Sequence, residues 1–129
     1  MADKVFPIAP FNRIVNEYLP YNLNYNYIYQ SSGLERHVEK RHPECVEYLQ
    51  YLPFIIAHPD YIGINPNESG TSFELVKVFD KNIQIGIKLD MKDDYLYVAT
   101  LHSITNGKLQ HGLENGRLKK IWQECIIYL

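Results

Sequence analysis

The strongest constraint on the fold is a run of three strand-like segments separated only by short turns. Residues 73–79, 82–90 and 95–104 are rich in Val, Ile, Leu and Tyr, and much of their apolar content alternates with polar residues. Segments this close in sequence pair most simply as antiparallel hairpins. The pattern therefore predicts an antiparallel β-meander at the centre of the chain.

The turns of this meander predict which residues face the core. A two-residue turn at residues 80–81 would pair Val78 with Ile83. The next turn would pair Ile87 with Val98. Both registers place apolar side chains on one face, which we predict to be the core face. The residues predicted to share it are Val76, Val78, Ile83, Ile85, Ile87, Leu96 and Val98.

The opposite face of the same strands collects small and positively charged residues. Gly86 and Ala99 leave room above the strands, whereas Lys77 and Lys88 bring positive charge to them. Tyr97, beside Lys88, offers a ring that can stack on a base and a hydroxyl that can donate to a phosphate. We predict that a ligand lies on this face. The alternative is an ordinary exposed face, on which lysine discourages aggregation.

Segments with helical spacing precede and follow the meander in the sequence. Residues 1–9 are predicted to be a loose arm, and apolar spacing over residues 11–19 predicts a helix. A second helix begins near Gly33 and must break before Pro43, where helical geometry is disfavoured. Residues 105–118 predict a short helix after the strands. We therefore expect an α+β fold in which N-terminal helices pack on a curved antiparallel sheet.

Residues 33–42 concentrate more groups that transfer protons or bind phosphate than any other stretch. His37 lies inside the predicted helix, and His42 lies at its end. An unperturbed histidine pKa near ~6.5 suits acid–base catalysis at neutral pH. Arg41 adds a cation beside them, although Glu39 and its neighbours partly neutralise the segment. An ordinary solvated helix surface is the alternative interpretation.

The end of the last strand carries a second group of reactive side chains. Thr100, His102 and Ser103 fall within four residues, beside the lysine-bearing face. They indicate a catalytic or phosphate-binding role, although strand ends also carry such residues as turn formers. The sequence contains no P-loop, GxSxG, HExxH or GxGxxG pattern, which disfavours nucleotide hydrolysis, serine hydrolysis and zinc proteolysis. We predict neither a metal nor a cofactor.

Length, net charge and cysteine content limit the class of protein to which the chain can belong. A chain of 129 residues is most simply one domain, 1–129, with the arm and first helix in residues 1–30. No apolar run approaches the ~20 residues of a membrane span, so we expect no membrane partner. The formal net charge of -2 gives no global electrostatic case for nucleic acid. Two isolated cysteines suit a reduced, cytoplasmic setting.

The order of several short motifs resembles the barnase–EndoU–colicin–RelE-like nucleases, in particular their phage-associated and polymorphic-toxin branches. The resemblance spans roughly residues 31–120 and is carried by order and spacing. The matching runs are Gly33-Leu34, His37-Val38, Lys40-Arg41-His42, Tyr61-Ile62-Gly63-Ile64-Asn65-Pro66, Phe73-Glu74-Leu75-Val76-Lys77, Ile87-Lys88-Leu89-Asp90 and Tyr95-Leu96-Tyr97-Val98-Ala99-Thr100.

This resemblance implies a barnase/RelE-like fold and a metal-independent endoribonuclease, acting as a toxin or phage effector by acid–base catalysis on the RNA 2′-hydroxyl. It also implies a cytoplasmic site of action, a cognate immunity protein or antitoxin, and delivery within a larger secreted toxin or a phage particle. We assign catalytic roles to His37, His42, Lys88 and Thr100. We assign substrate binding to Lys77, Arg41, Tyr97, Ser103 and His102.

Two other functional classes remain open at the level of sequence. A non-catalytic binding module, such as an immunity protein or a phage-encoded inhibitor, fits the acidic pI of about 6.2 and the eleven tyrosines. Its contact surface would then be residues 18–29. A phosphate-ester or nucleotide-modifying enzyme could use the same basic face, and analysis of its products would distinguish it.

Overall fold

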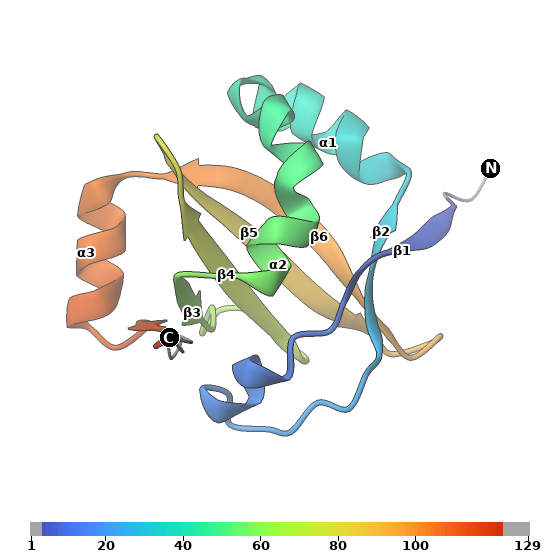
Figure 1. The fold of residues 1–129 in the computed structure, drawn as a ribbon, viewed down its shortest axis with the longest axis horizontal. Helices are drawn as coiled ribbons and strands as arrows, with labels where there is room; N and C mark the ends of the chain where they lie inside the picture. Colours follow the sequence, from blue (N-terminus) through green and yellow to red (C-terminus); the bar gives the residue numbers. More distant parts are fainter. Residues whose placement is uncertain (1–3, 123–129) are drawn as a thin grey trace, which may run out of the picture.

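The computed structural model describes residues 4–122, which form a seven-stranded sheet with helices (Figure 1). The predicted α+β class is confirmed. The order of the strands across the sheet is β1-β2-β6-β5-β4-β3-β7. The strands are β1 Val5–Pro10, β2 Tyr27–Ser31, β3 Tyr61–Gly63, β4 Ser72–Val78, β5 Asn82–Asp90, β6 Tyr95–Ile104 and β7 Leu118–Lys120. The helices are α1 Gly33–Arg41, α2 Leu52–Ala57 and α3 Asn106–Glu114, with 3₁₀ segments η1 Arg13–Glu17 and η2 Pro43–Tyr51.

The N-terminal segment departs from the prediction. β1 is an edge strand that pairs antiparallel with β2, so the predicted loose arm is wrong for the residues that form this strand. Pro7 and Pro10 are tolerated because a proline in an edge strand need not donate to a neighbour. The helix predicted over residues 11–19 is reduced to the short 3₁₀ segment η1. The first element is therefore a strand, and the helices are not grouped at the N-terminus.

Three helical segments cover one face of the sheet and enclose the main core. The break predicted before Pro43 is confirmed, because α1 ends at Arg41 and η2 begins at Pro43. Leu34 and Val38 of α1 are buried, as are apolar residues of η2 and α2. They pack against the strands, whose buried core residues are Ala9, Ile28, Ile62, Phe73, Leu75, Ile83, Ile85, Ile87, Leu96, Val98 and Leu101.

The pairing of β4 with β5 is one residue away from the predicted register. Val78 pairs with Asn82, and Ile83 pairs with Lys77. The turn contains three residues, 79–81, because the backbone N–H of Phe79 donates to the carbonyl of Lys81. A shift of one residue moves every side chain of a strand to the other face. Phe73 and Leu75 therefore enter the main core, while Val78 is exposed.

The pairing of β5 with β6 confirms the second predicted register, including Ile87 with Val98. The register shifts between Gly86 and Ile87, where Gly86 pairs with Thr100, so Ala99 is the extra residue of a β-bulge. A bulge re-aims the side chains that follow it. It places Tyr97 and Thr100 on the same face although three positions separate them.

Two further features complete the architecture. The predicted antiparallel meander is confirmed for β4, β5 and β6. β2 pairs with β6 in parallel, so the sheet as a whole is not purely antiparallel as predicted. Only the first half of β6 is paired in this way, which leaves its edge free beyond Tyr97 among the described strands. Within residues 4–122, no helix is both long and apolar enough to cross a bilayer. Residues 121–129 were predicted to pack down, and this holds for Ile121, which is buried, but not for Trp122, which is 72% exposed. Residues 123–129 lie outside the described part.

Candidate functional site

Polar side chains form a strip on the sheet face opposite to α1 and α2. The pairing that sets this strip matches Gln84 with His102, Gly86 with Thr100, and Lys88 with Tyr97. Because these residues alternate with the core residues of the same strands, they point away from the main core. We call the strip the open face and define it by Glu74, Gln84, Gly86, Lys88, Tyr97, Thr100 and His102.

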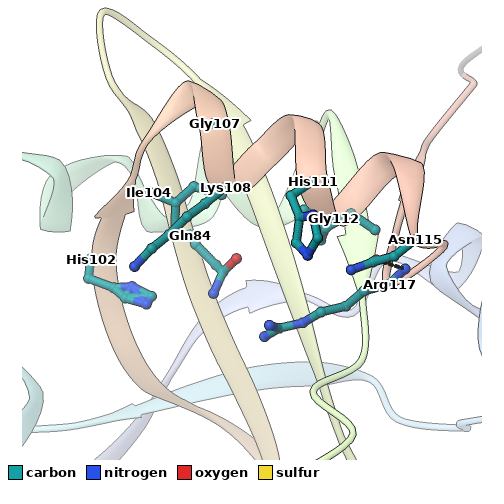
Figure 2. Close-up of a pocket in the computed structure, with 10 residues that line it drawn as sticks. Gln84, His102, Ile104, Gly107, Lys108, His111, Gly112, Asn115 and Arg117 are labelled. Carbon is teal, nitrogen blue, oxygen red and sulfur yellow. Dashed lines mark hydrogen bonds between the residues drawn. The ribbon is translucent and has the colours of Figure 1, made fainter.

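A cavity of about 450 Å³ lies at one end of the open face, where α3 covers the strands. Figure 2 shows that side chains from β5, β6, α3 and the segment after α3 point into it. Its lining consists of Gln84, His102, Ile104, Gly107, Lys108, His111, Gly112, Asn115, Arg117 and Leu118. Four of these are His, Lys or Arg, and none of the described lining residues is Asp or Glu. This α3 cavity is therefore positively charged within a chain of net negative charge.

Local sequence explains how α3 presents its side chains. The Thr105 hydroxyl accepts a hydrogen bond of 3.1 Å from the backbone N–H of Lys108, which caps the N-terminus of the helix. Lys108 and His111 are three residues apart and so share one helical face. Gly112 lets Leu118 approach closely, because a Cβ atom there would lie 2.7 Å from Leu118 Cδ1. The helix can therefore seat close to β7.

A hydrogen-bonded chain beneath the cavity holds Arg117. Its Nη2 lies 2.8 Å from Glu74 Oε1, and the Gln84 amide donates to Glu74 Oε2 at 2.7 Å. Gly116 has a φ of 79°, a left-handed geometry that reverses the chain after α3. The Arg117 backbone N–H then donates to Asn115 Oδ1 at 2.9 Å. These contacts aim the guanidinium along the floor of the cavity (Figure 2).

His102 has the most unusual environment of the histidines described. Its Nδ1 is buried and has no hydrogen-bond partner among the described protein groups. Burial lowers the pKa of His102, because the imidazolium loses solvation, and the neighbouring His42 lowers it further. His102 is therefore neutral at pH 7, and a neutral imidazole in a cationic cavity can accept a proton.

The residues predicted from sequence to form a site are divided among several places. His102 lines the α3 cavity, and the ring of His42 lies against that of His102 with 5.5 Å between centroids. Lys88 and Thr100 line a narrow recess farther along the open face. Lys88 forms an ion pair with Glu68 at 3.3 Å. His102, Lys88 and Thr100 therefore share the open face, although they do not line one cavity.

The predicted site residues that lie near the helices do not line the α3 cavity. His37 lines a separate recess at the free edge of β6, with Tyr97. Arg41 is exposed at the end of α1. Lys77 was predicted to lie beside Lys88, and this placement is wrong because the β4–β5 register is shifted by one residue. Lys77 instead faces the helices, where it forms an ion pair with Asp60 at 3.3 Å.

Ser103 also points away from the open face. It pairs with Ile83 on the helix-covered side, close to the thiol of Cys45. Burial raises the pKa of that thiol, which keeps it protonated at neutral pH. Among residues 4–122, no group of three His, Cys, Asp or Glu side chains is arranged to hold a metal ion.

Sequence reasoning missed the contribution of α3. His111, Lys108 and Arg117 were not among the residues predicted to form a site. The available signal was the i, i+3 spacing of Lys108 and His111 shortly after a strand that carries His102 near its end. The fold-back of α3 onto the open face brings them together, and that packing is not encoded in local spacing.

Comparison with known proteins gives one match. A family model described as phage-Barnase-EndoU-ColicinE5/D-RelE like nuclease3 matches residues 8–111, which is more than half of the chain. The matched segment begins within β1 and ends at His111, so it contains His102 and Lys108 but not Arg117. Neither the curated proteins nor the solved structures gave a match.

Proposed function

This chain belongs to the phage-barnase-EndoU-colicin-RelE-like nuclease family, and we propose that it is an endoribonuclease whose reaction takes place in the α3 cavity. The observation that carries the proposal is the convergence of His102, His111, Lys108 and Arg117 on one cavity of about 450 Å³. A phosphodiester is an anion that gains charge during cleavage, and this cavity offers two imidazoles and two cations.

The residues can divide the chemistry between them. Neutral His102 accepts the proton of the 2′-hydroxyl, and the freed oxygen attacks phosphorus. The bond between phosphorus and the 5′-oxygen breaks as His111, in its imidazolium form, donates a proton to that oxygen. The 2′-oxygen stays bound to phosphorus, so the first product is a 2′,3′-cyclic phosphate. Arg117 and Lys108 stabilise the negative charge of the transition state.

The positions of residues around the α3 cavity and along the open face suggest supporting roles for them. Glu74 holds Arg117 in place, and His42 packs on His102 and disfavours its protonated form. Thr100 and Lys88 lie on the same open face and are suited to bind the RNA beyond the scissile phosphate. Of the four residues first assigned to catalysis, this proposal keeps His42 as a positioning residue and moves the acid–base role to His102 and His111.

Product analysis tests the reaction class. Purified protein with excess chelator should cleave a fluorescent RNA oligonucleotide and leave a 2′,3′-cyclic phosphate end. The same oligonucleotide with a single 2′-deoxynucleotide at the cleaved position should resist, because the nucleophile is missing. Cleavage of that substituted substrate, or intact RNA under all conditions, would overturn the proposal. Intact RNA would favour a non-catalytic binding module.

The biological setting is a further part of the proposal. We place the activity in the cytoplasm, as a toxin or phage effector restrained by an immunity protein or antitoxin that blocks the α3 cavity. An active nuclease inhibits the cell that makes it. Expression of the wild-type chain should therefore arrest growth, whereas His102→Ala should express freely. Equal growth with both chains would contradict this setting.

A further inference from the structure

The open face continues beyond the α3 cavity into a group of tyrosines contributed by two neighbouring strands. Tyr29 of β2 pairs with Tyr97 of β6, and Tyr95 lies two residues before Tyr97 on the same side. Because side chains two apart share a face, Tyr27 joins them at one end. Tyr27 is 50% exposed, and the other three are partly exposed. We call Tyr27, Tyr29, Tyr95 and Tyr97 the tyrosine platform.

We propose that the tyrosine platform binds the bases of single-stranded RNA whose scissile phosphate occupies the α3 cavity. This inference rests on the proposed function and names the form of its substrate. Aromatic rings stack on any base, which suits single strands whose bases are unpaired. In a duplex the bases are stacked on each other and cannot lie flat on side chains. The platform therefore selects single strands over duplexes.

Contacts within the platform hold its rings in place before RNA arrives. The rings of Tyr29 and Tyr95 meet edge to face, with 5.5 Å between centroids and 71° between planes. The rings of Tyr95 and Tyr97 are 5.8 Å apart. Burial and the nearby negative charge of Asp90 raise the pKa of Tyr95. Preordered rings lose less conformational entropy when a base stacks on them.

The route from the platform to the α3 cavity lies along β6. Tyr97, Thr100 and His102 follow one another on the open face of this strand, and the bulge at Ala99 aligns them. Gly86 sits opposite Thr100 and carries no side chain, so the middle of the route is shallow. Because of the bulge, Tyr97 and His102 face positions only four residues apart on β5, Lys88 and Gln84, a distance of about 13 Å, which leaves space for more than one nucleotide.

Charges around the platform indicate where the RNA backbone lies. Lys88 is directly opposite Tyr97, and His37 shares with Tyr97 a recess of about 350 Å³ at the free edge of β6. The β5–β6 hairpin beyond Tyr95 carries Asp90, Asp93 and Asp94, which repel phosphates. The bound strand should therefore stack its bases on the platform with its phosphates turned toward Lys88 and His37, and it should not continue over the hairpin. This gives His37 a role in binding RNA.

Equilibrium binding to a non-cleavable oligonucleotide tests the platform without relying on catalysis. The probe is a fluorescein-labelled, mixed-sequence 2′-O-methyl oligonucleotide, used as a single strand or annealed to its complement. Tyr29→Val and Tyr97→Val keep a residue that favours strands and remove the ring. Each should weaken binding of the single strand between about fivefold and 100-fold. Tyr29→Phe and Tyr97→Phe should bind almost as well as wild type.

The controls separate stacking from general damage. Tyr51→Leu removes an exposed tyrosine from η2, on the other side of the sheet, and should leave binding unchanged. Tyr97→Trp, which enlarges the ring, should bind at least as tightly as wild type. Equal binding by wild type and both valine variants would overturn the inference, as would equal affinity for single strand and duplex. Loss of cleavage in His102→Ala with unchanged binding of the probe would leave both proposals intact.

The two proposals fail in different ways. If wild type cleaves RNA but the valine variants bind and cleave normally, the tyrosine platform is wrong and the α3 cavity stands. If the platform binds single strands but no RNA is cleaved, the proposed reaction is wrong. If wild type does not bind the single strand at all, the platform serves another purpose, such as contact with a protein, and the inference fails.

Discussion

The imidazole ring of His42 stands edge-on to that of His102, with 5.5 Å between centroids and 87° between planes. One ring comes from the end of α1 and the other from β6, so this contact joins the helical layer to the open face. Two histidines this close oppose each other's protonation. The first prediction follows from this coupling.

His42→Gln should raise the pKa of His102 toward its ordinary value without reaching it. Burial is the larger cause of the lowered pKa, and it remains in the variant. Titration of the histidine ring protons by NMR measures the shift. The acid limb of the pH profile of kcat/KM should move in the same direction, because protonated His102 cannot accept a proton. An unchanged His102 pKa would show that His42 does not act on it.

The same lowered pKa has a consequence for stability. The unfolded chain binds a proton at this histidine more tightly than the native chain does, so the native state is favoured above the unfolded pKa of about 6.5. This contribution is lost as pH falls from there through the lower native pKa. Between pH 7 and pH 5, the free energy of unfolding measured in urea should fall less for His102→Gln than for wild type. An equal fall in both proteins would contradict a lowered pKa of His102 in the native state.

Glu74→Gln should weaken the interaction that holds the Arg117 side chain and should disturb the α3 cavity. The variant loses the charge that pairs with the guanidinium, so we expect a loss of about 1 kcal/mol in the free energy of unfolding. We also expect kcat/KM to fall about tenfold, equivalent to about 1.4 kcal/mol. Asp60→Asn is the matched control, because it breaks the Lys77 ion pair on the helix-covered side. Equal loss of activity in both variants would refute a specific role for Glu74.

Gly86→Ala should destabilise the centre of the open face. A Cβ atom there would lie 2.6 Å from Thr100 Oγ1, so either the Thr100 side chain or the strands must shift, at a cost of about 1–3 kcal/mol. Removing that oxygen with Thr100→Ala should relieve the conflict. Denaturant unfolding of the single and double variants forms a double-mutant cycle. Additive losses would mean that the two side chains do not meet.

Two glycines of α3 give a paired prediction. A Cβ atom at Gly107 meets no atom closer than 3.8 Å, so Gly107→Ala should stabilise the protein by about 0.5–1 kcal/mol through helix propensity. Gly112→Ala should gain less or destabilise, because its Cβ would lie 2.7 Å from Leu118 Cδ1. Thermal unfolding of both variants measures the difference. Equal stabilisation by both substitutions would show that the Leu118 side chain moves aside without an energetic cost.

Local pattern was sufficient for part of this fold. The bounds of β5 and β6 and their mutual register follow from alternation and turn chemistry, and so does the break at Pro43. The register between β4 and β5 does not follow from these patterns, because a contact from outside the hairpin fixes its turn. The Tyr48 hydroxyl of η2 hydrogen-bonds to Asp80 at the tip of that turn, a contact that no local rule anticipates.

The candidate site was partly predictable for the same reason. His102, Thr100 and Lys88 lie on one strand pair, so alternation places them together. Lys108, His111 and Arg117 reach them only because α3 folds back and the chain reverses at Gly116. The parallel pairing of β2 with β6, which creates the tyrosine platform, joins segments distant in sequence. Tertiary packing decides such pairings.

The most direct test of the α3 cavity compares alanine variants of four histidines in one RNA-cleavage assay with chelator present. His102→Ala and His111→Ala should each lower kcat by about 100-fold or more, as expected for loss of a general acid or base. His37→Ala should mainly raise KM. His58→Ala, an exposed histidine at the end of α2, should behave as wild type. Full activity in His102→Ala and His111→Ala, with cleavage abolished in His37→Ala, would contradict the assignment of the reaction to this cavity.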